Sequence, residues 1–213
     1  LPPNNVQALG ISPTEVLVSF TAPAGSYVVE YGAPGFTPGT TNAAGPGGTV
    51  VFTGTSPVSI GTPPLTTPLT PNTTYDFYVR RICTPGVDYS INVKTTATTL
   101  CTATNIPYLQ DFSTATPPAG FPTCTSMEDV NGNSGPVGNS TGGRWTTFAG
   151  TTTQTYVSPV NVLRYLYDLP NPARGADDWF YIRGLNLNGG TSYRLKFFYK
   201  GSDGPTWIER LEV

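Results

Sequence analysis

The alternation of apolar and polar side chains predicts that this chain is built from β-strands. Over 75–83 the apolar side chains of Tyr75, Phe77, Val79 and Cys83 fall on odd positions, and polar or amphipathic residues fill most even ones. A period of two is typical of a strand with one buried face. Arg81 interrupts the apolar positions and is expected at the rim of the sheet, with its stem packed and its head in water.

Comparable short runs recur through the first hundred residues and predict a sandwich of seven strands. The expected strands are 5–9, 15–20, 26–31, 49–53, 57–60, 75–83 and 89–95. The lead-in Leu69-x-Pro71-x-Thr73-x-Tyr75 is typical of a tyrosine corner, in which the tyrosine bonds back to the preceding turn. Pro71 and Asn72 would make that turn. The segment 33–48 is dense in Gly, Pro and Thr and is predicted to be a loop.

The second half shows the same strand pattern after a Thr-rich linker, so a second all-β unit is expected. Strands are predicted at 107–112, from 143 to 145 onward, and at 162–167, 178–182, 193–199 and 207–213. The clearest of them is 193–199, where Tyr193, Leu195, Phe197 and Tyr199 share one face. The predicted organisation is therefore two all-β domains, 1–100 and 101–213.

Composition excludes several classes of function. The 24 Gly and 22 Pro favour strands and turns, and charged residues make up only 11%. A net charge of −2 gives no basic footprint, so no nucleic-acid partner is expected. The chain has no His, which removes the commonest general base and the commonest zinc and copper ligand. No catalytic motif is present, so the chain is not expected to be an enzyme, and no apolar run is long enough to span a membrane.

The three cysteines are Cys83, Cys101 and Cys124. Without Cys-x-x-Cys spacing, metal or thioredoxin chemistry is not expected. In an extracellular protein the count favours one disulfide and one remaining thiol. We favour Cys101–Cys124, which would stabilise the chain by roughly 3 kcal/mol in the chain-entropy account, with Cys83 free or paired with a residue upstream of Leu1. The alternative is three buried thiols.

Residues 1–100 resemble a fibronectin type III domain, in the variant common in bacterial surface adhesins. The resemblance rests on Glu30-Tyr31-Gly32-x-x-Gly35-Phe36-Thr37-Pro38-Gly39, on the 69–75 corner, and on Tyr75-Asp-Phe-Tyr-Val79 leading to Cys83. Two positions depart from the pattern. Phe20 stands where a core Trp is usual, and Arg81 stands where a small apolar residue is expected. In such relatives the cysteine matching Cys83 often has a partner just before the first strand, which this chain lacks.

Residues 101–213 resemble the jelly-roll module of MAM-like, cleaved-adhesin and choice-of-anchor proteins. The residues that carry this resemblance are Pro107…Asp111-Phe112…Pro118…Gly120-Phe121, Asp177-Asp178-Trp179, Leu185…Gly190-x-x-Tyr193-x-Leu195-x-Phe197-x-Tyr199 and Glu209-Arg-Leu-Glu-Val213. Complete members run well beyond this point. The resemblance therefore implies a partial jelly-roll β-sandwich, truncated at its C-terminal end.

A structural calcium ion is implied by the same resemblance. Asp129, Asn131 and Asn133 place oxygen-bearing side chains at alternate positions, as hard-cation loops do, although a plain Asx-rich turn gives the same pattern. The jelly-roll modules often hold an ion near their first strand and the Asp-Asp-Trp segment. The expected ligands are Asp111, Asp129, Asp177 and Asp178, and the alternative for the last two is a turn that caps Trp179.

Aromatic residues supply the candidate binding surface. Aromatic faces suit the apolar faces of sugars, but most of the tryptophans alternate with polar residues and are expected in the core. Trp207, in the Gly-rich 201–207 stretch, is the one expected to be exposed and to bind a ligand.

The two resemblances imply a non-catalytic fragment of a secreted or cell-surface bacterial adhesin that binds a glycan or a surface protein. They also imply export by the machinery of the type IX route. One alternative is a structural subunit whose incomplete jelly roll accepts a strand from another copy or chain. Another is the accessory region of a large secreted hydrolase or peptidase.

Overall fold

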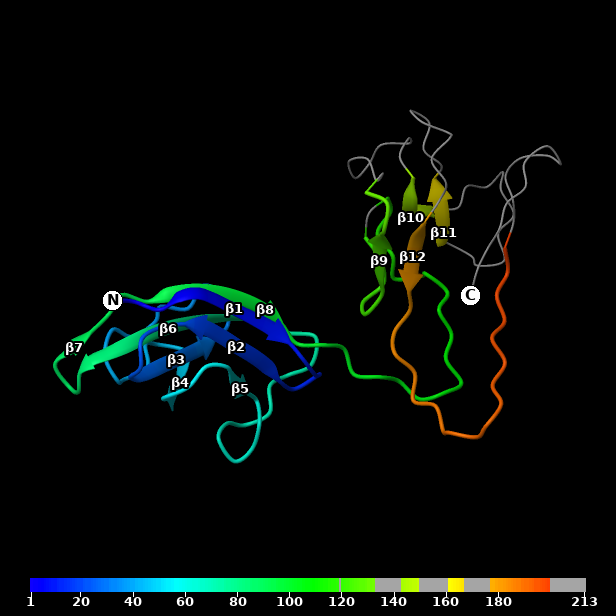
Figure 1. The fold of residues 1–213 in the computed structure, drawn as a ribbon. Coiled ribbons are helices and arrows are strands. Elements are labelled where there is room, and N and C mark those ends of the chain that lie inside the picture. Colours follow the sequence, from blue (N-terminus) through cyan, green and yellow to red (C-terminus); the bar gives the residue numbers. More distant parts are fainter. Residues whose placement is uncertain (119, 133–142, 150–160, 167–176, 200–213) are drawn as a thin grey trace. The chain divides into compact units, whose positions relative to one another are not determined.

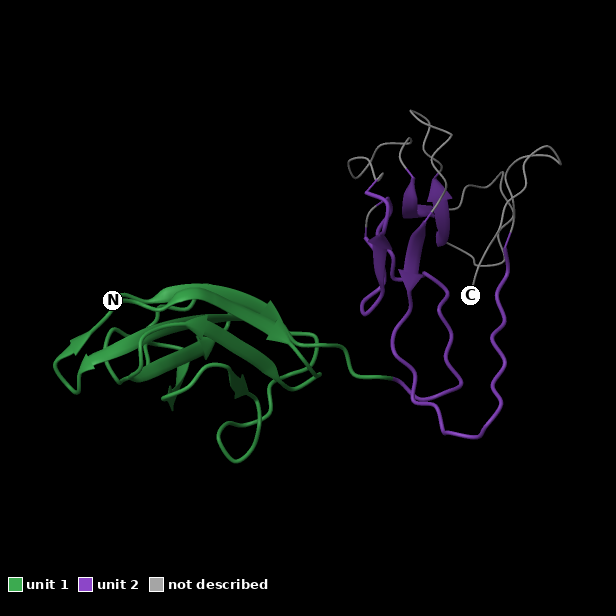
Figure 2. Ribbon diagram, viewed as in Figure 1, with its two compact units in different colours: residues 1–103 green, residues 104–213 purple. Residues whose placement is uncertain are grey.

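The computed structural model describes residues 1–118, 120–132, 143–149, 161–166 and 177–199. The chain divides into two compact units, Leu1–Ala103 and Thr104–Val213 (Figure 2). The described residues contain strands and turns and no helix, so the expected all-β class is confirmed. Consequently, no helix in the described ranges is long and apolar enough to cross a membrane.

Unit 1 is a β-sandwich of two antiparallel sheets (Figure 1). One sheet has the order β1-β2-β5, and the other has the order β4-β3-β6-β7, with β8 also paired to β6. The strands are β1 (Asn4–Gly10), β2 (Val16–Thr21), β3 (Ser26–Gly32), β4 (Gly48–Thr53), β5 (Val58–Ile60), β6 (Thr74–Thr84), β7 (Asp88–Tyr89) and β8 (Val93–Thr98).

The core of unit 1 lies between the sheets, because each strand turns its alternate apolar residues inward. Val16 and Val18 of β2 meet Phe77 and Val79 of β6, and all four are fully buried. Phe20 is also buried, with its ring 4.9 Å from that of Tyr27. A phenylalanine therefore occupies core space where the resemblance leads one to expect a tryptophan.

The tyrosine corner is present as predicted. The hydroxyl of Tyr75 accepts a hydrogen bond from the backbone N–H of Thr70, at 3.0 Å. Asn72 adopts a left-handed φ of 48°, which Asn tolerates better than most residues. The turn before β6 is thus fixed by a side chain from the strand that it introduces.

Two expectations for unit 1 need correction. The last strand was expected at 89–95, but Ser90 to Asn92 form no strand, and β8 instead runs from Val93 to Thr98. Ser90 accounts for the break, because its hydroxyl accepts from the N–H of Arg81 at 2.9 Å. Arg81 is half-buried, and its head is only partly withdrawn from water. Its Nη2 donates to the carbonyl of Ala24 at 3.1 Å, and its Nε is buried without a hydrogen-bond partner in the described structure.

Unit 2 contains two antiparallel strand pairs within its described residues. β10 (Arg144–Ala149) pairs with β11 (Asn161–Leu166), and β12 (Asp178–Tyr181) pairs with β9 (Ser126–Asp129). Phe180 packs against Phe112, Phe121 and Trp145, with ring centroids 5.5–6.3 Å apart. The four rings form a half-buried aromatic cluster, and the jelly-roll architecture stays a prediction.

Within the described residues, two predicted segments of unit 2 are not assigned as strands. The segment 107–112 is irregular, because Phe112 takes a left-handed φ of 58° and Leu109 is 81% exposed. The segment 193–199 joins no ladder with any described residue, and Leu195, Phe197 and Tyr199 are exposed. Its alternation sets which side is apolar, but a strand also needs a hydrogen-bonded neighbour. The predicted strand at 207–213 lies outside the described residues.

Candidate functional site

Three of the four expected calcium ligands lie at one end of the β9–β12 pair. Asp129 is directly opposite Asp178 in the ladder, and Asp177 immediately precedes β12. The backbone N–H of Val130 donates to the carbonyl of Asp177 at 3.1 Å, which continues the pairing by one residue. Strand register therefore brings together acidic residues that are about fifty positions apart in the sequence.

The carboxyl of Asp178 lies in a partly apolar setting. The hydroxyl of Tyr165 donates to its Oδ2 at 2.6 Å, while its Oδ1 is buried with no hydrogen-bond partner in the described structure. Burial raises the pKa of Asp178, and the charges of Asp129 and Asp177 raise it further, against the lowering effect of the Tyr165 hydrogen bond. The indole N–H of Trp145 also donates to the Asp178 carbonyl at 2.9 Å.

Asp111, the fourth expected ligand, closes a local turn. Its Oδ1 accepts from the backbone N–H of Ser113 at 3.0 Å and from the Ser113 hydroxyl at 2.7 Å. These hydrogen bonds lower the pKa of the Asp111 carboxyl, the one from the backbone N–H most. Among the described residues, no three acidic, His or Cys side chains are grouped so as to hold a metal ion. The calcium site therefore stays a prediction.

Cys101 and Cys124 are disulfide-bonded, and Cys83 is an exposed free thiol at the end of β6. The Sγ of Cys124 also accepts a hydrogen bond from Nη2 of Arg183, at 3.1 Å. Trp207, the expected binding residue, lies outside the described residues.

An exposed aromatic pair on β12 was missed from the sequence. Trp179 was expected in the core, yet it is 41% exposed, and Tyr181 is 45% exposed. The residue between them, Phe180, instead packs against Phe112 and Phe121 in the aromatic cluster. The order Asp178-Trp179-Phe180-Tyr181 contained the signal, because alternation allows only one of these two faces to be inside.

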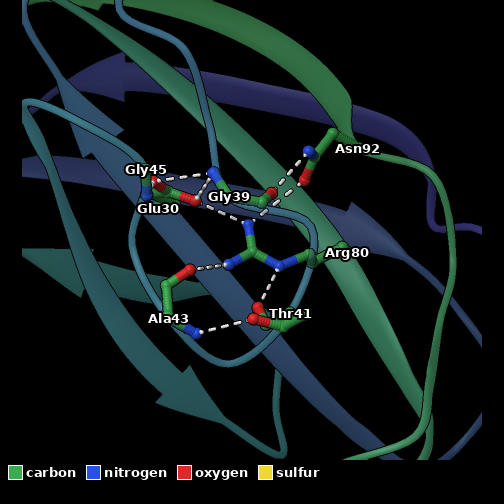
Figure 3. A network of polar contacts seen from close by, with 7 residues as sticks. All are labelled: Glu30, Gly39, Thr41, Ala43, Gly45, Arg80 and Asn92. Carbon is green, nitrogen blue, oxygen red and sulfur yellow. Dashed lines mark hydrogen bonds and ion pairs between the residues drawn. The ribbon is translucent and has the colours of Figure 1, made fainter.

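A buried ion pair in unit 1 was also missed. Glu30 of β3 and Arg80 of β6 are both 0% exposed, and Nη1 of Arg80 lies 2.6 Å from Oε2 of Glu30 (Figure 3). Both residues sit on the face of the sheet that points away from the apolar core, at positions where polar side chains normally meet water. They are buried because the 33–48 loop folds over them.

Arg80 anchors this loop through backbone carbonyls. Its Nε donates to the carbonyl of Thr41 at 2.7 Å, and its Nη2 donates to that of Ala43 at 3.2 Å (Figure 3). Its Nη1 also donates to Oδ1 of Asn92 at 3.2 Å. A planar guanidinium suits such a cage because its five donors point in fixed directions.

Glu30 binds the opposite side of the loop. Its carboxylate accepts from the backbone N–H of Gly39 at 2.9 Å and from that of Gly45 at 2.6 Å. The Nδ2 of Asn92 adds a bond to the Gly39 carbonyl at 2.9 Å. The donors of Arg80 and the acceptors of Glu30 are thus used inside the protein, and the network holds a loop rather than forming an anion or acid–base site.

A second charged pair lies on the same side of the β3–β6 sheet. Nζ of Lys94 is 2.8 Å from Oδ2 of Asp76. Asp76 also accepts from the N–H of Gly35 at 2.8 Å and from the Thr96 hydroxyl at 2.7 Å. Burial alone would raise the pKa of this carboxyl, but these hydrogen bonds and the Lys94 charge outweigh it and lower the pKa to about 2.

We therefore expect unit 1 to lose stability in acid as Asp76 is protonated. Because the folded pKa is below the ordinary value of 3.8, the stabilisation is complete above about pH 4 and is lost as the pH falls toward 2. In urea titrations from pH 5 to pH 2, the unfolding free energy of Asp76→Asn should fall less steeply with decreasing pH than that of the wild type. The difference between the two slopes should correspond to the uptake of at most about one proton on unfolding.

The matched control for this titration is Asp88→Asn, an exposed carboxylate of β7 in the same unit. Its pH profile should follow that of the wild type. An Asp76→Asn profile parallel to the wild type would show that the depressed pKa does not contribute to stability.

No protein-family model and no curated protein matches the sequence. Among solved structures, a computationally redesigned β-sandwich protein is similar at 27% identity and a TM-score of 0.35, over 49% of this chain and 94% of that chain. The fn3 domain of human collagen alpha-1(XX) chain is similar at 24% identity and a TM-score of 0.36, over 49% of this chain and 89% of that one. FN3tt is similar at 16% identity and a TM-score of 0.34, over 46% of this chain and 92% of that one.

Proposed function

We propose that the chain is a non-catalytic binding region of a secreted or cell-surface protein. Unit 1 serves as a spacer and display element, and unit 2 contacts a glycan or a surface protein. The observation that carries this proposal is the exposed aromatic pair of unit 2, Trp179 and Tyr181, which lie two residues apart on β12. Exposed apolar patches mark interaction surfaces.

Two features support an extracellular, non-enzymatic role. The disulfide of Cys101 and Cys124 suits an oxidising compartment. The buried charges of unit 1, Glu30 and Arg80, are engaged in structural bonds. A bacterial surface location and export by the type IX route rest on the family resemblance.

The experiment is a binding measurement on the intact chain. Immobilised 1–213 would be exposed in parallel to neutral and acidic polysaccharides and to extracellular-matrix proteins, with an unrelated protein of the same size as reference. We expect saturable retention of at least one of them. If the chain retains none of these polysaccharides and matrix proteins more strongly than the reference protein does, the proposal is contradicted.

Calcium is the proposed structural ion, and melting curves test it. An ion that binds only the native state raises its stability, so the melting temperature should be higher in calcium than in chelator. Asp129→Asn should remove most of that difference, whereas Asp88→Asn, in unit 1, should keep it. A melt that does not respond to chelator would exclude a structural calcium ion.

Assembly by strand complementation is the second candidate. The exposed segment 193–199, which joins no ladder with any residue that the structure describes, favours it, because an extended segment with one apolar side can accept a donor strand. Light scattering across a hundredfold range of concentration distinguishes the two candidates. Complementation predicts that the chain forms oligomers of fixed stoichiometry. The binding-region proposal does not require any oligomer.

A further inference from the structure

The outer face of the β9–β12 pair is fixed by the packing of its inner face. In the ladder Trp179 is opposite Glu128, and Tyr181 is opposite Ser126. All four of these side chains are exposed, while Met127 and Phe180 between them are half-buried. Phe180 is held 5.5 Å from Phe121 and 5.8 Å from Phe112. Because alternate residues must point to opposite faces, Trp179 and Tyr181 are held outward while Phe180 stays inside.

Glu128 lies directly opposite Trp179 in the ladder and is bonded to Tyr181. The Tyr181 hydroxyl donates to Oε2 of Glu128 across the strands, at 2.6 Å. Residues i and i+2 of a strand are about 7 Å apart, so the indole and the phenol lie side by side. The outer face therefore presents two aromatic rings with a carboxylate beside them, and its tyrosine ring is held in place by a hydrogen bond.

The position of Glu128 favours a sugar over a protein as the occupant. The buried centres of protein–protein interfaces are depleted in charged residues, whereas here the exposed Glu128 is the ladder partner of Trp179. Sugar hydroxyls can donate to a carboxylate while the C–H face of the same ring lies on an aromatic ring, whose face is electron-rich. A sugar can therefore contact both the aromatic rings and the carboxylate of this surface.

The negative charge of this surface indicates which sugars it can bind. Glu128 places a carboxylate on the outer face itself, apart from the proposed calcium ligands Asp129, Asp177 and Asp178. Uronic acids, sulfated sugars and nucleic-acid phosphates would meet this negative charge, and like charges disfavour binding.

We propose that Trp179, Tyr181 and Glu128 form a binding platform for a neutral polysaccharide. The aromatic rings stack on C–H faces of the sugars, and Glu128 accepts hydrogen bonds from their hydroxyls. This inference rests on the proposed function and names its ligand class and its site.

Affinity electrophoresis of the intact chain tests the platform. The probes are the neutral polysaccharides β-1,3-glucan, xylan and galactomannan and the acidic polysaccharides alginate and polygalacturonate. We expect at least one neutral probe to retard the chain and neither acidic probe to do so. Trp179→Ala should weaken that retardation at least about tenfold, because it removes one stacked ring, and Glu128→Gln should weaken it less.

Two variants separate the site from general effects. Phe52→Ala removes an aromatic ring of unit 1 that is 52% exposed, and it should bind as the wild type does. Tyr181→Phe keeps the ring but loses its bond to Glu128, and should bind two- to threefold more weakly, about half a kcal/mol. Because the replaced side chains are exposed, we expect the variants to fold. Melting curves that match the wild type would show that they do.

The outcomes are distinguishable from those of the proposed function. Neutral-glycan binding that survives Trp179→Ala, or a preference for acidic glycans, would overturn the platform and leave a binding role intact. Binding to proteins without binding to any glycan would do the same. Absence of binding to every probe and every matrix protein would overturn both proposals.

Discussion

Replacing Arg80 with methionine is expected to destabilise unit 1 by about 3–5 kcal/mol, because it leaves the Glu30 carboxylate buried without a counter-ion. The pair is fully buried and its charged atoms are 2.6 Å apart. The same change leaves the carbonyls of Thr41 and Ala43 without their donors. For a unit of about a hundred residues, each kcal/mol lowers the melting temperature by about 4–8 °C.

Urea denaturation monitored by circular dichroism measures this effect, and Arg81→Met provides the matched control. Arg81 is the neighbouring residue on β6, is only half-buried, and donates to a single carbonyl. We expect a loss of about 1 kcal/mol or less for the control. The double variant Glu30→Leu/Arg80→Met removes both charges and should lose less than the sum of the single variants. Equal losses for Arg80→Met and Arg81→Met would show that the buried pair does not stabilise the unit.

Replacing Gly45 with alanine should also destabilise unit 1, by about 1–3 kcal/mol, because no space exists for a methyl group. A Cβ on Gly45 would collide with the Thr37 carbonyl and lie 2.7 Å from the backbone nitrogen of Gly39. Both neighbours are backbone atoms of the same loop, so neither can move alone. The loop would have to open, and the bond from Gly45 to Glu30 would be lost with it.

Gly54→Ala is the matched control for this substitution. A Cβ at Gly54 would have its nearest neighbour at 3.9 Å, and neither glycine has a positive φ. The two variants therefore differ in space and not in backbone strain. Thermal melts should show a clear decrease for Gly45→Ala and almost none for Gly54→Ala. A decrease of the same size for both would mean that the 33–48 loop is not closely packed.

Alternation along single strands predicted most of unit 1. Val16, Val18 and Phe20 occupy every second position of β2 and are all buried, as the period of two requires. The tyrosine corner was predictable because its partners, Thr70 and Tyr75, are five residues apart. Features that depend on neighbouring residues are accessible from sequence patterns.

The Glu30–Arg80 pair was not predictable in this way, because its partners are fifty residues apart. Each residue occupies a position that alternation assigns to solvent. Only the folded 33–48 loop changes that environment, and nothing in a Gly- and Pro-rich composition specifies which face a loop will cover. The Glu30-to-Gly39 motif contained the acceptor and one of its donors, but their role appears only in three dimensions.

In unit 2 the alternation of apolar and polar residues predicted which side of a segment is apolar better than it predicted which segments pair in a sheet. The 193–199 segment alternates more clearly than any other, yet among the described residues it has no ladder neighbour. Trp179 was expected in the core because most of the tryptophans alternate with polar residues along predicted strands. Its actual orientation follows from Phe180, whose packing against Phe112 and Phe121 takes the inner face.

The caged ion pair also has a kinetic consequence. Arg80 can meet Glu30 in a dry setting only after β3 and β6 have paired and the 33–48 loop has closed, so the pair should form after the rate-limiting step of folding. Interactions that form so late slow unfolding and hardly affect folding. In a chevron experiment Arg80→Met should therefore raise the unfolding rate and leave the folding rate nearly unchanged, whereas a slower folding rate would place the pair in the nucleus. The loop anchor would then determine how long each folded molecule lasts, which would suit the extracellular spacer role proposed for unit 1.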